Sequence, residues 1–154
     1  MQKVARPQVE DLLEEAAELG REQVTFPLVI FNLARRLADQ PDKEDTYARA
    51  APYLSSHPNA FVRRVFFTMI RFMETPSLAP RLASVCLQGL RDPSPWVQYD
   101  AAWMAADYRI ANAEIVAALG ALAGGYKGGE DIDPGDAQAN LRRRAAETLR
   151  ALAH

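Results

Sequence analysis

The chain has 154 residues, 49% hydrophobic and 25% charged, which is enough for one globular domain with a substantial core. Its formal net charge of −2 disfavours binding of nucleic acid through broad positive charge. A single cysteine, Cys86, excludes an intramolecular disulfide. The first residues lack the apolar core of a signal peptide, and no stretch approaches the roughly 20 apolar residues of a membrane span. We therefore expect one cytoplasmic domain over residues 1–154, without membrane contact.

Apolar residues recur at helical spacing through most of the sequence, and no strand-like alternation interrupts them. The first helix is expected from about Pro7, which suits a first helical turn, to Leu19, with Gly20 ending it. The second is expected over 26–38, where the run at 28–31 is apolar nearly all round and predicts burial between layers, with Asn32, Arg35 and Arg36 as the solvent-facing positions. The acids of the first helix are interpreted as a solvent-exposed face, with a docking surface as the alternative: Glu10, Asp11, Glu14, Glu15 and Glu18.

Six further helices are expected, several of them with recognisable capping residues. Asp45 or Thr46 is predicted to cap a third helix ending at Leu54, which Pro52 should bend or shorten. Ser77 is predicted to cap the fifth helix. The other expected ranges are 60–73, 77–90, 95–108, 113–122 after the cap Asn112, and 137–153 after the cap Asp136. The fold class predicted is all-α.

Three of the long helices share one sequence register. The residues that lead into them, His57, Asp92 and Asp136, lie 35 and then 44 residues apart along the chain. The longer interval contains the glycine-rich loop 124–135. Repetition at this period is typical of a solenoid, in which each helix pair buries its apolar face on the next pair. The aligned segments are Val62–Ile70, Val97–Ala105 and Leu141–Leu149.

The recurring pattern Asp-Pro…Val-Arg…Ala-Ala…Leu resembles the HEAT and HEAT-like (armadillo-type) helical repeat family, most clearly over residues 44–154. The resemblance implies a right-handed α-α superhelix of about four helix pairs, with the second helices lining the concave side. The approximate units are 7–38, 44–73, 77–108 and 112–153. The family's ladder of Asp and Arg should be interrupted, because His57 replaces the acid in one unit and Gln98 the arginine in another.

The residues at the expected helix contacts differ in size from one long helix to another. Alanine pairs at 101–102 and 145–146 predict close approach of neighbouring helices, whereas Phe66 and Phe67 predict a thicker layer of the core. Cys86 lies in an apolar run and is interpreted as a small buried hydrophobic residue.

One face of the long helices is a candidate binding surface. If the apolar residues of helix 60–73 face the core, helical geometry turns Arg64, Thr68 and Arg71 outward, and equivalent positions follow in the later helices. Tryptophan, tyrosine and arginine are the residues that most often dominate binding interfaces. The alternative is that Trp103 packs against its neighbour and the arginines serve solubility. The predicted partner-binding residues are Arg64, Arg71, Tyr99, Trp103, Arg143 and Arg150.

Asp100 is a weak catalytic candidate. Trp96, Asp100 and Trp103 lie at helical spacing, so that two indoles flank an acid. This arrangement resembles the HEAT-like alkylpurine DNA glycosylases, but the acidic balance of the chain argues against binding of phosphates. The alternative that we favour is an ion pair of Asp100 with Arg64 or Arg144.

Neither a metal nor a cofactor is expected. The acids of loop 124–135 do not have the spacing of a calcium-binding loop, and no phosphate-binding glycine motif is present. Tyr126 and Lys127 lie between glycine pairs, which is typical of a mobile binding finger or equally of a flexible insertion.

The function predicted is a non-enzymatic protein-binding module, such as a small adaptor, inhibitor or immunity-type protein, that uses its concave face as a monomer or weak homo-oligomer. The alternatives are an enzyme of the DNA glycosylase or lyase type centred on Asp100, and a structural subunit of a larger assembly.

Overall fold

The computed structural model describes residues 8–22 and 26–153. These residues form eight α-helices and one short 3₁₀ helix without any strand, so the predicted all-α class is confirmed. None of the helices in these ranges has both the length and the apolar composition needed to cross a membrane. The chain divides into two compact units, with the boundary between Met73 and Glu74.

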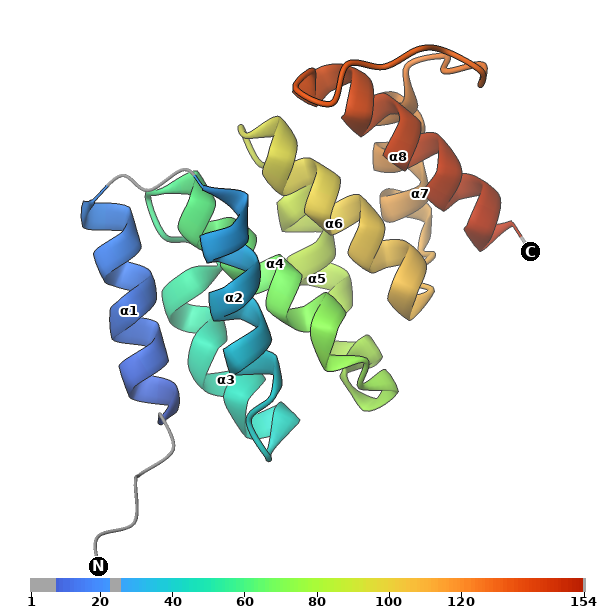
Figure 1. The fold of residues 1–154 in the computed structure, drawn as a ribbon. Helices are drawn as coiled ribbons and strands as arrows, with labels where there is room; N and C mark the ends of the chain where they lie inside the picture. The colour runs from blue at the N-terminus through green and yellow to red at the C-terminus, as the bar shows by residue number, and fades with distance from the viewer. Residues whose placement is uncertain (1–7, 23–25, 154) are drawn as a thin grey trace, which may run out of the picture. The chain divides into compact units, whose positions relative to one another are not determined.

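The N-terminal unit contains four helices in two layers: α1 (Val9–Arg21), α2 (Pro27–Ala38), α3 (Lys43–Leu54) and α4 (Ala60–Met73). Helix α2 packs along α4, and α1 packs against α3 (Figure 1). Phe66 and Phe67 are buried, as predicted, and their rings meet edge to face at 5.2 Å between centroids. The core of the unit also includes Leu12, Ala16, Ile30, Leu33, Leu37, Leu54, Val62, Met69 and Ile70.

The prediction that the run at 28–31 is buried between layers is wrong. Ile30 and Leu33 face the core, but Leu28 is 69% exposed and Phe31 is 38% exposed. The other helices of the unit cover only one side of α2, which leaves the opposite side open to solvent. An apolar run therefore identified the helix but not the extent of its burial.

Gly20 does not end α1, which continues to Arg21. A Cβ atom at position 20 would lie 2.8 Å from Cε1 of His57 and 3.2 Å from Cγ2 of Val62. A methyl group here would therefore press on side chains of α4 and of the turn before it. The predicted start of the helix at Pro7 lies outside the described residues.

Two other predicted caps are corrected. Helix α3 begins one turn earlier than expected, because the Asp42 side chain accepts a hydrogen bond from the Asp45 N–H at 3.0 Å. Pro52 lies inside α3, which still reaches Leu54. Ser77 belongs to the 3₁₀ helix η1 (Pro76–Leu78), and α5 (Ala79–Leu90) follows directly.

The C-terminal unit continues with α6 (Pro95–Tyr108), α7 (Ala113–Ala123) and α8 (Ala137–Leu152). Helix α6 packs against α5 and α8, and α7 packs against α5 and α8 (Figure 1). The predicted caps of the last two helices are confirmed. Asn112 accepts from the Ile115 N–H at 2.9 Å, and Asp136 accepts from the Ala139 N–H at 3.0 Å.

The alanine pair of α6 brings side chains of two other helices onto its backbone. The Thr148 hydroxyl of α8 donates to the Ala102 carbonyl at 2.8 Å, and the Cys86 thiol of α5 lies 3.6 Å from the Ala101 carbonyl. Both alanines are fully buried. Cys86 is buried as predicted, and burial raises the pKa of its thiol to about 12.

Equivalent turns lead into α4 and α6 despite their different residues. The Asn59 N–H donates to Nδ1 of His57 at 3.0 Å, as the Ser94 N–H donates to Oδ1 of Asp92 at 2.8 Å. Arg63 and Gln98 occupy aligned positions near the start of α4 and α6. The Arg63 side chain donates to the His57 carbonyl at 2.8 Å. The Gln98 side chain similarly donates to the carbonyl of Leu90 at 2.9 Å. His57 therefore makes the same turn hydrogen bond as Asp92, whereas Arg63 bonds to the turn before its helix and Gln98 bonds to the end of α5.

We predict opposite effects of alanine at two helical glycines. Gly20→Ala should destabilise the chain by about 1–3 kcal/mol, because the added methyl group displaces His57 or Val62 and outweighs the gain in helix propensity. Gly120→Ala in α7 is the matched control, since nothing lies within 4 Å of the added methyl group. It should stabilise by about 0.5–1 kcal/mol. Urea unfolding of the two variants measures both changes, and equal effects would contradict the packing role of Gly20.

His57 should make the stability of the fold depend on pH. Burial, and then the positive charge of Arg63, lower the pKa of His57, so the folded chain holds this imidazole neutral below its ordinary pKa of about 6.5. The unfolded chain binds the proton first, and the free energy of unfolding should therefore fall as the pH drops below about 6.5. His57→Asp keeps an acceptor for the Asn59 N–H and should lose less stability than wild type between pH 7.5 and 5.5 in urea titrations. Parallel losses in the two proteins would assign the pH dependence to other groups.

Candidate functional site

Three aromatic side chains form a row along α6. The ring centroids of Trp96 and Tyr99 are 5.4 Å apart, and those of Tyr99 and Trp103 are 5.7 Å apart. Both pairs are close to perpendicular, which is a favourable edge-to-face geometry. All three side chains remain partly exposed. We call these residues the aromatic row.

Helix α8 places a cation on the end of this row. The guanidinium carbon of Arg144 lies 4.1 Å from the ring centroid of Trp103, within the range of a cation–π interaction. Arg144 also donates to Oε2 of Glu147 at 2.8 Å. Its Nε atom is buried and has no hydrogen-bond acceptor among the described residues. From the sequence, Arg144 is predicted only as a partner of Asp100, and no local pattern indicates its contact with Trp103.

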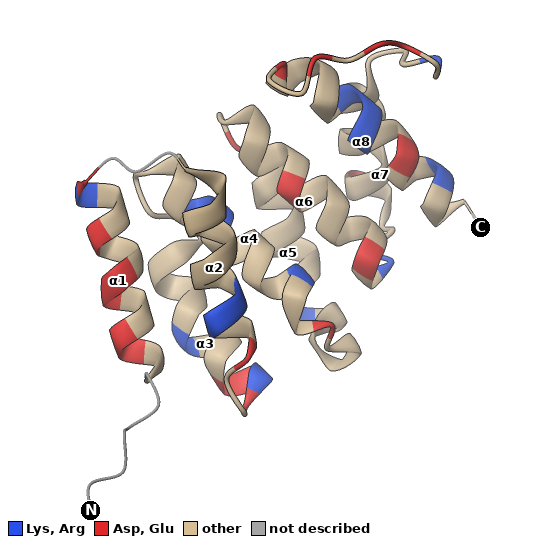
Figure 2. Cartoon of the chain, viewed as in Figure 1, with Lys and Arg blue, Asp and Glu red and all other residues tan. Residues whose placement is uncertain are grey.

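Further arginines follow along α8. Arg143 donates to Oδ1 of Asn140 at 3.0 Å, and its Nε lies 4.0 Å from Oε1 of Glu147, so one glutamate serves both arginines. Arg150 is exposed near the end of the helix. In the sequence of α8 the acidic Glu147 lies between these basic positions, and Figure 2 shows basic and acidic positions along this helix. Arginines therefore outnumber acids on this helix, and Arg144 is the one that contacts the aromatic row.

Thr148 joins α8 to α6 close to the aromatic row. This residue follows Arg144 by one helical turn, and its hydroxyl is bonded to the Ala102 carbonyl, next to Trp103 in the chain. The hydrogen bond and the stacked Arg144 thus join the same two turns of α6 and α8. The aromatic row and its arginine are held by buried contacts rather than by loops.

Asp100 is not an accessible acid. It is only 1% exposed, although Trp96 and Trp103 on the same helix are partly exposed. A general acid or nucleophile must reach its substrate, and this burial gives the catalytic hypothesis no geometric support. The ion pair of Asp100 with Arg64 or Arg144 stays a prediction.

The predicted outward positions on α4 need correction. Arg64 is 7% exposed and Thr68 is fully buried, because α4 is covered over most of its circumference. Arg71 is partly exposed. Arg64 and Arg71 belong to the N-terminal unit, and the site described above is confined to α6 and α8 of the C-terminal unit.

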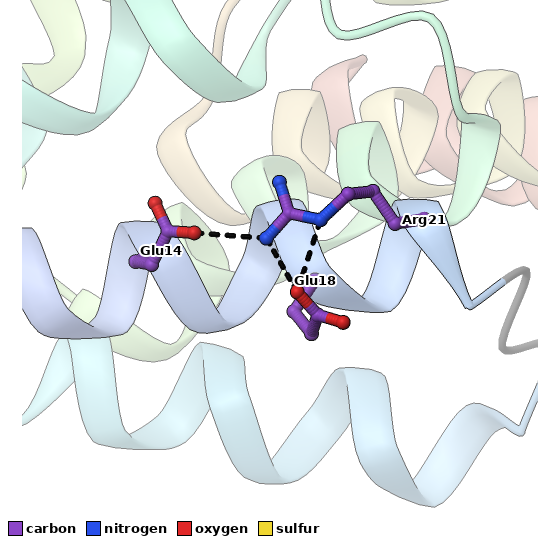
Figure 3. Close-up of polar contacts among 3 residues, drawn as sticks. All are labelled: Glu14, Glu18 and Arg21. Carbon is purple, nitrogen blue, oxygen red and sulfur yellow. Dashed lines mark hydrogen bonds and ion pairs between the residues drawn. The ribbon is translucent and has the colours of Figure 1, made fainter.

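The acidic face of α1 is exposed as predicted and is largely neutralised by arginines (Figure 2). Arg21 lies between Glu18 and Glu14, with its Nε 2.9 Å from Glu18 and its Nη2 2.8 Å from Glu14 (Figure 3). These two carboxylates raise the pKa of Arg21. Further pairs join Glu15 to Arg36 and Glu10 to Arg49. Exposed pairs of this kind contribute little stability, and they leave few free acids for a basic partner.

No metal centre is apparent in the described residues, which contain no group of three or more His, Cys, Asp or Glu side chains able to hold an ion. In the loop 124–135, Asp133 accepts from the Gly135 N–H at 2.8 Å. Asp136 is occupied as the cap of α8. These acids have local structural roles at the start of the helix.

Comparison of the chain with protein-family models, with curated proteins and with solved structures found no match.

The hydroxyl of Thr148 should be needed for the Trp103–Arg144 contact. Thr148→Val keeps the side-chain volume but removes the donor to the Ala102 carbonyl, and should cost about 1 kcal/mol of unfolding free energy. Loosening of α8 should also increase the quenching of Trp103 fluorescence by acrylamide. This is measured in a chain in which Trp96 is replaced by Phe, so that Trp103 is the one fluorescent tryptophan. Thr148→Ser retains the hydroxyl and should keep the quenching of wild type. Equal quenching in the two variants would show that the hydroxyl does not hold this contact.

Proposed function

We propose that the chain is a non-enzymatic, HEAT-like protein-binding module of about four helix pairs. Support for the repeat assignment comes from the packing within each unit, where consecutive helices pair and alternate helices lie in the same layer. The shared register of three long helices supports the same reading.

The partner-binding surface of the C-terminal unit consists of the aromatic row together with Arg143 and Arg144. The observation that carries this proposal is the stack of Arg144 on Trp103 at the end of three partly exposed rings. Tryptophan, tyrosine and arginine contribute most of the binding energy at many interfaces. Here their mutual contacts restrict their rotamers before any partner binds, which lowers the entropic cost of association.

The charge of this surface favours a partner segment that offers hydrogen-bond acceptors. Arg143, Arg144 and Arg150 exceed the single Glu147 between them on α8. A carboxylate or backbone carbonyl of the partner can accept from these guanidinium groups while its apolar atoms cover the rings. The formal net charge of −2 argues against nucleic acid as the ligand.

Affinity capture from the native organism tests the proposal with matched variants. Trp103→Ala combined with Arg143→Ala should reduce capture of the partner by more than tenfold, since each truncation removes a candidate hot spot worth about 1–2 kcal/mol. The control combines Arg91→Ala with Val116→Ala, which removes an exposed arginine and an exposed apolar side chain from the other layer of the same unit.

The control should capture the partner as wild type does, with circular dichroism showing that both variants are folded. If the same protein is retained by both variants, or lost from both, the aromatic row is not the binding surface.

A further inference from the structure

A second surface of different composition lies on α2. Leu28, Phe31 and Arg35 recur at i, i+3 and i+7, so they share the face opposite the buried Ile30 and Leu33. Phe26, immediately before the helix, is 64% exposed. The large apolar side chains that stand open to solvent among the described residues are Phe26, Leu28, Phe31, Tyr53 and Val116, and three of them belong to this short segment.

Helix α4 extends this surface with another ring. The centroids of Phe31 and Phe72 are 6.4 Å apart, and the guanidinium carbon of Arg35 lies 4.0 Å from the ring centroid of Phe72. Phe72 is partly exposed. Clustered exposed apolar side chains of this kind mark sites of association more often than isolated ones do. We call Leu28, Phe31, Arg35 and Phe72 the α2 patch.

Arg35 differs from three other arginines of the unit. Arg21, Arg36 and Arg49 each pair with glutamates, whereas Arg35 has no carboxylate partner among the described residues. An exposed cation stacked on an aromatic ring and surrounded by apolar side chains is suited to a carboxylate that arrives with an apolar surface.

We propose that the α2 patch binds an amphipathic helix of a partner protein, one that carries an acidic side chain beside its apolar stripe. Side chains of the incoming helix at i, i+3, i+4 and i+7 would cover Leu28, Phe31 and Phe72. Its carboxylate would pair with Arg35. This surface is independent of the aromatic row on α6 and can exist whether or not that row binds a partner.

A second copy of the chain does not fit the patch. In a two-fold contact the same surface faces itself, and the α2 patch contains a cation but no carboxylate. Both copies of Arg35 would lose water without gaining a counter-ion, which is strongly unfavourable. A partner with its own acidic residue avoids this cost.

The test uses phage display of helical peptides. The positions on one face of the peptide helix, and those beside that face, are randomised. Clones selected on the wild-type chain should carry apolar residues at helical spacing with Asp or Glu beside them. Their affinity, measured by fluorescence anisotropy of the synthetic peptides, should fall at least tenfold for Leu28→Ser combined with Phe31→Ser. Tyr53→Ser in α3 is the matched control, because Tyr53 is as exposed as Leu28 (68% against 69%), and it should leave the affinity unchanged.

Reversal of the charge at position 35 makes the test specific. Selection on Arg35→Glu should enrich Lys or Arg where the wild-type chain enriched acids. Trp103→Ala should leave peptide binding intact, which separates this surface from the aromatic row. The proposal is overturned if no clone is enriched or if the affinity of enriched clones is unchanged by Leu28→Ser with Phe31→Ser. It is also overturned if clones selected on Arg35→Glu carry the same charges as those selected on the wild-type chain. Sedimentation showing a dimer that Leu28→Ser with Phe31→Ser dissociates would identify a second copy instead and also overturn it.

Discussion

The C-terminal unit depends on the close approach of two neighbouring helices to a pair of buried alanines in α6. At Ala101 and Ala102 the side chains of α6 are too small to hold its neighbours away, and the thiol of Cys86 and the hydroxyl of Thr148 reach its carbonyl groups from α5 and α8. Larger residues at either position would separate the helices and leave these polar groups buried without their acceptors. Packing and hydrogen bonding thus both require small side chains at positions 101 and 102 of α6.

This constraint explains how the candidate binding site is held. The same turns of α6 and α8 that share the Thr148 bond also bring Arg144 onto Trp103. The surface residues project from two helices whose register is set in the core, so their arrangement exists before a partner binds. Pre-organisation of this kind favours recognition of a defined partner over loose, adaptable contact.

The sequence predicted those elements whose signals are local. The bounds of α6 and the caps of α7 and α8 follow from proline, asparagine and aspartate at positions where few alternatives exist. Gly20 was misassigned because a glycine near the end of a helix can terminate it or allow close packing, and only the position of His57 distinguishes the two. For Leu28 and Phe31, hydropathy indicated a helix but not which neighbours cover it. Arg64 was placed outward because a nearly continuous apolar helix such as α4 does not define one buried face.

The lone cysteine of the chain reports on one unit only. Because the Cys86 thiol is fully buried and burial raises its pKa to about 12, it stays protonated and inaccessible at neutral pH. A thiol-specific reagent can modify it only when α5 separates from α6. The rate at which Cys86 is labelled therefore measures how often the C-terminal unit opens transiently. Fluctuations confined to the N-terminal unit leave this rate unchanged.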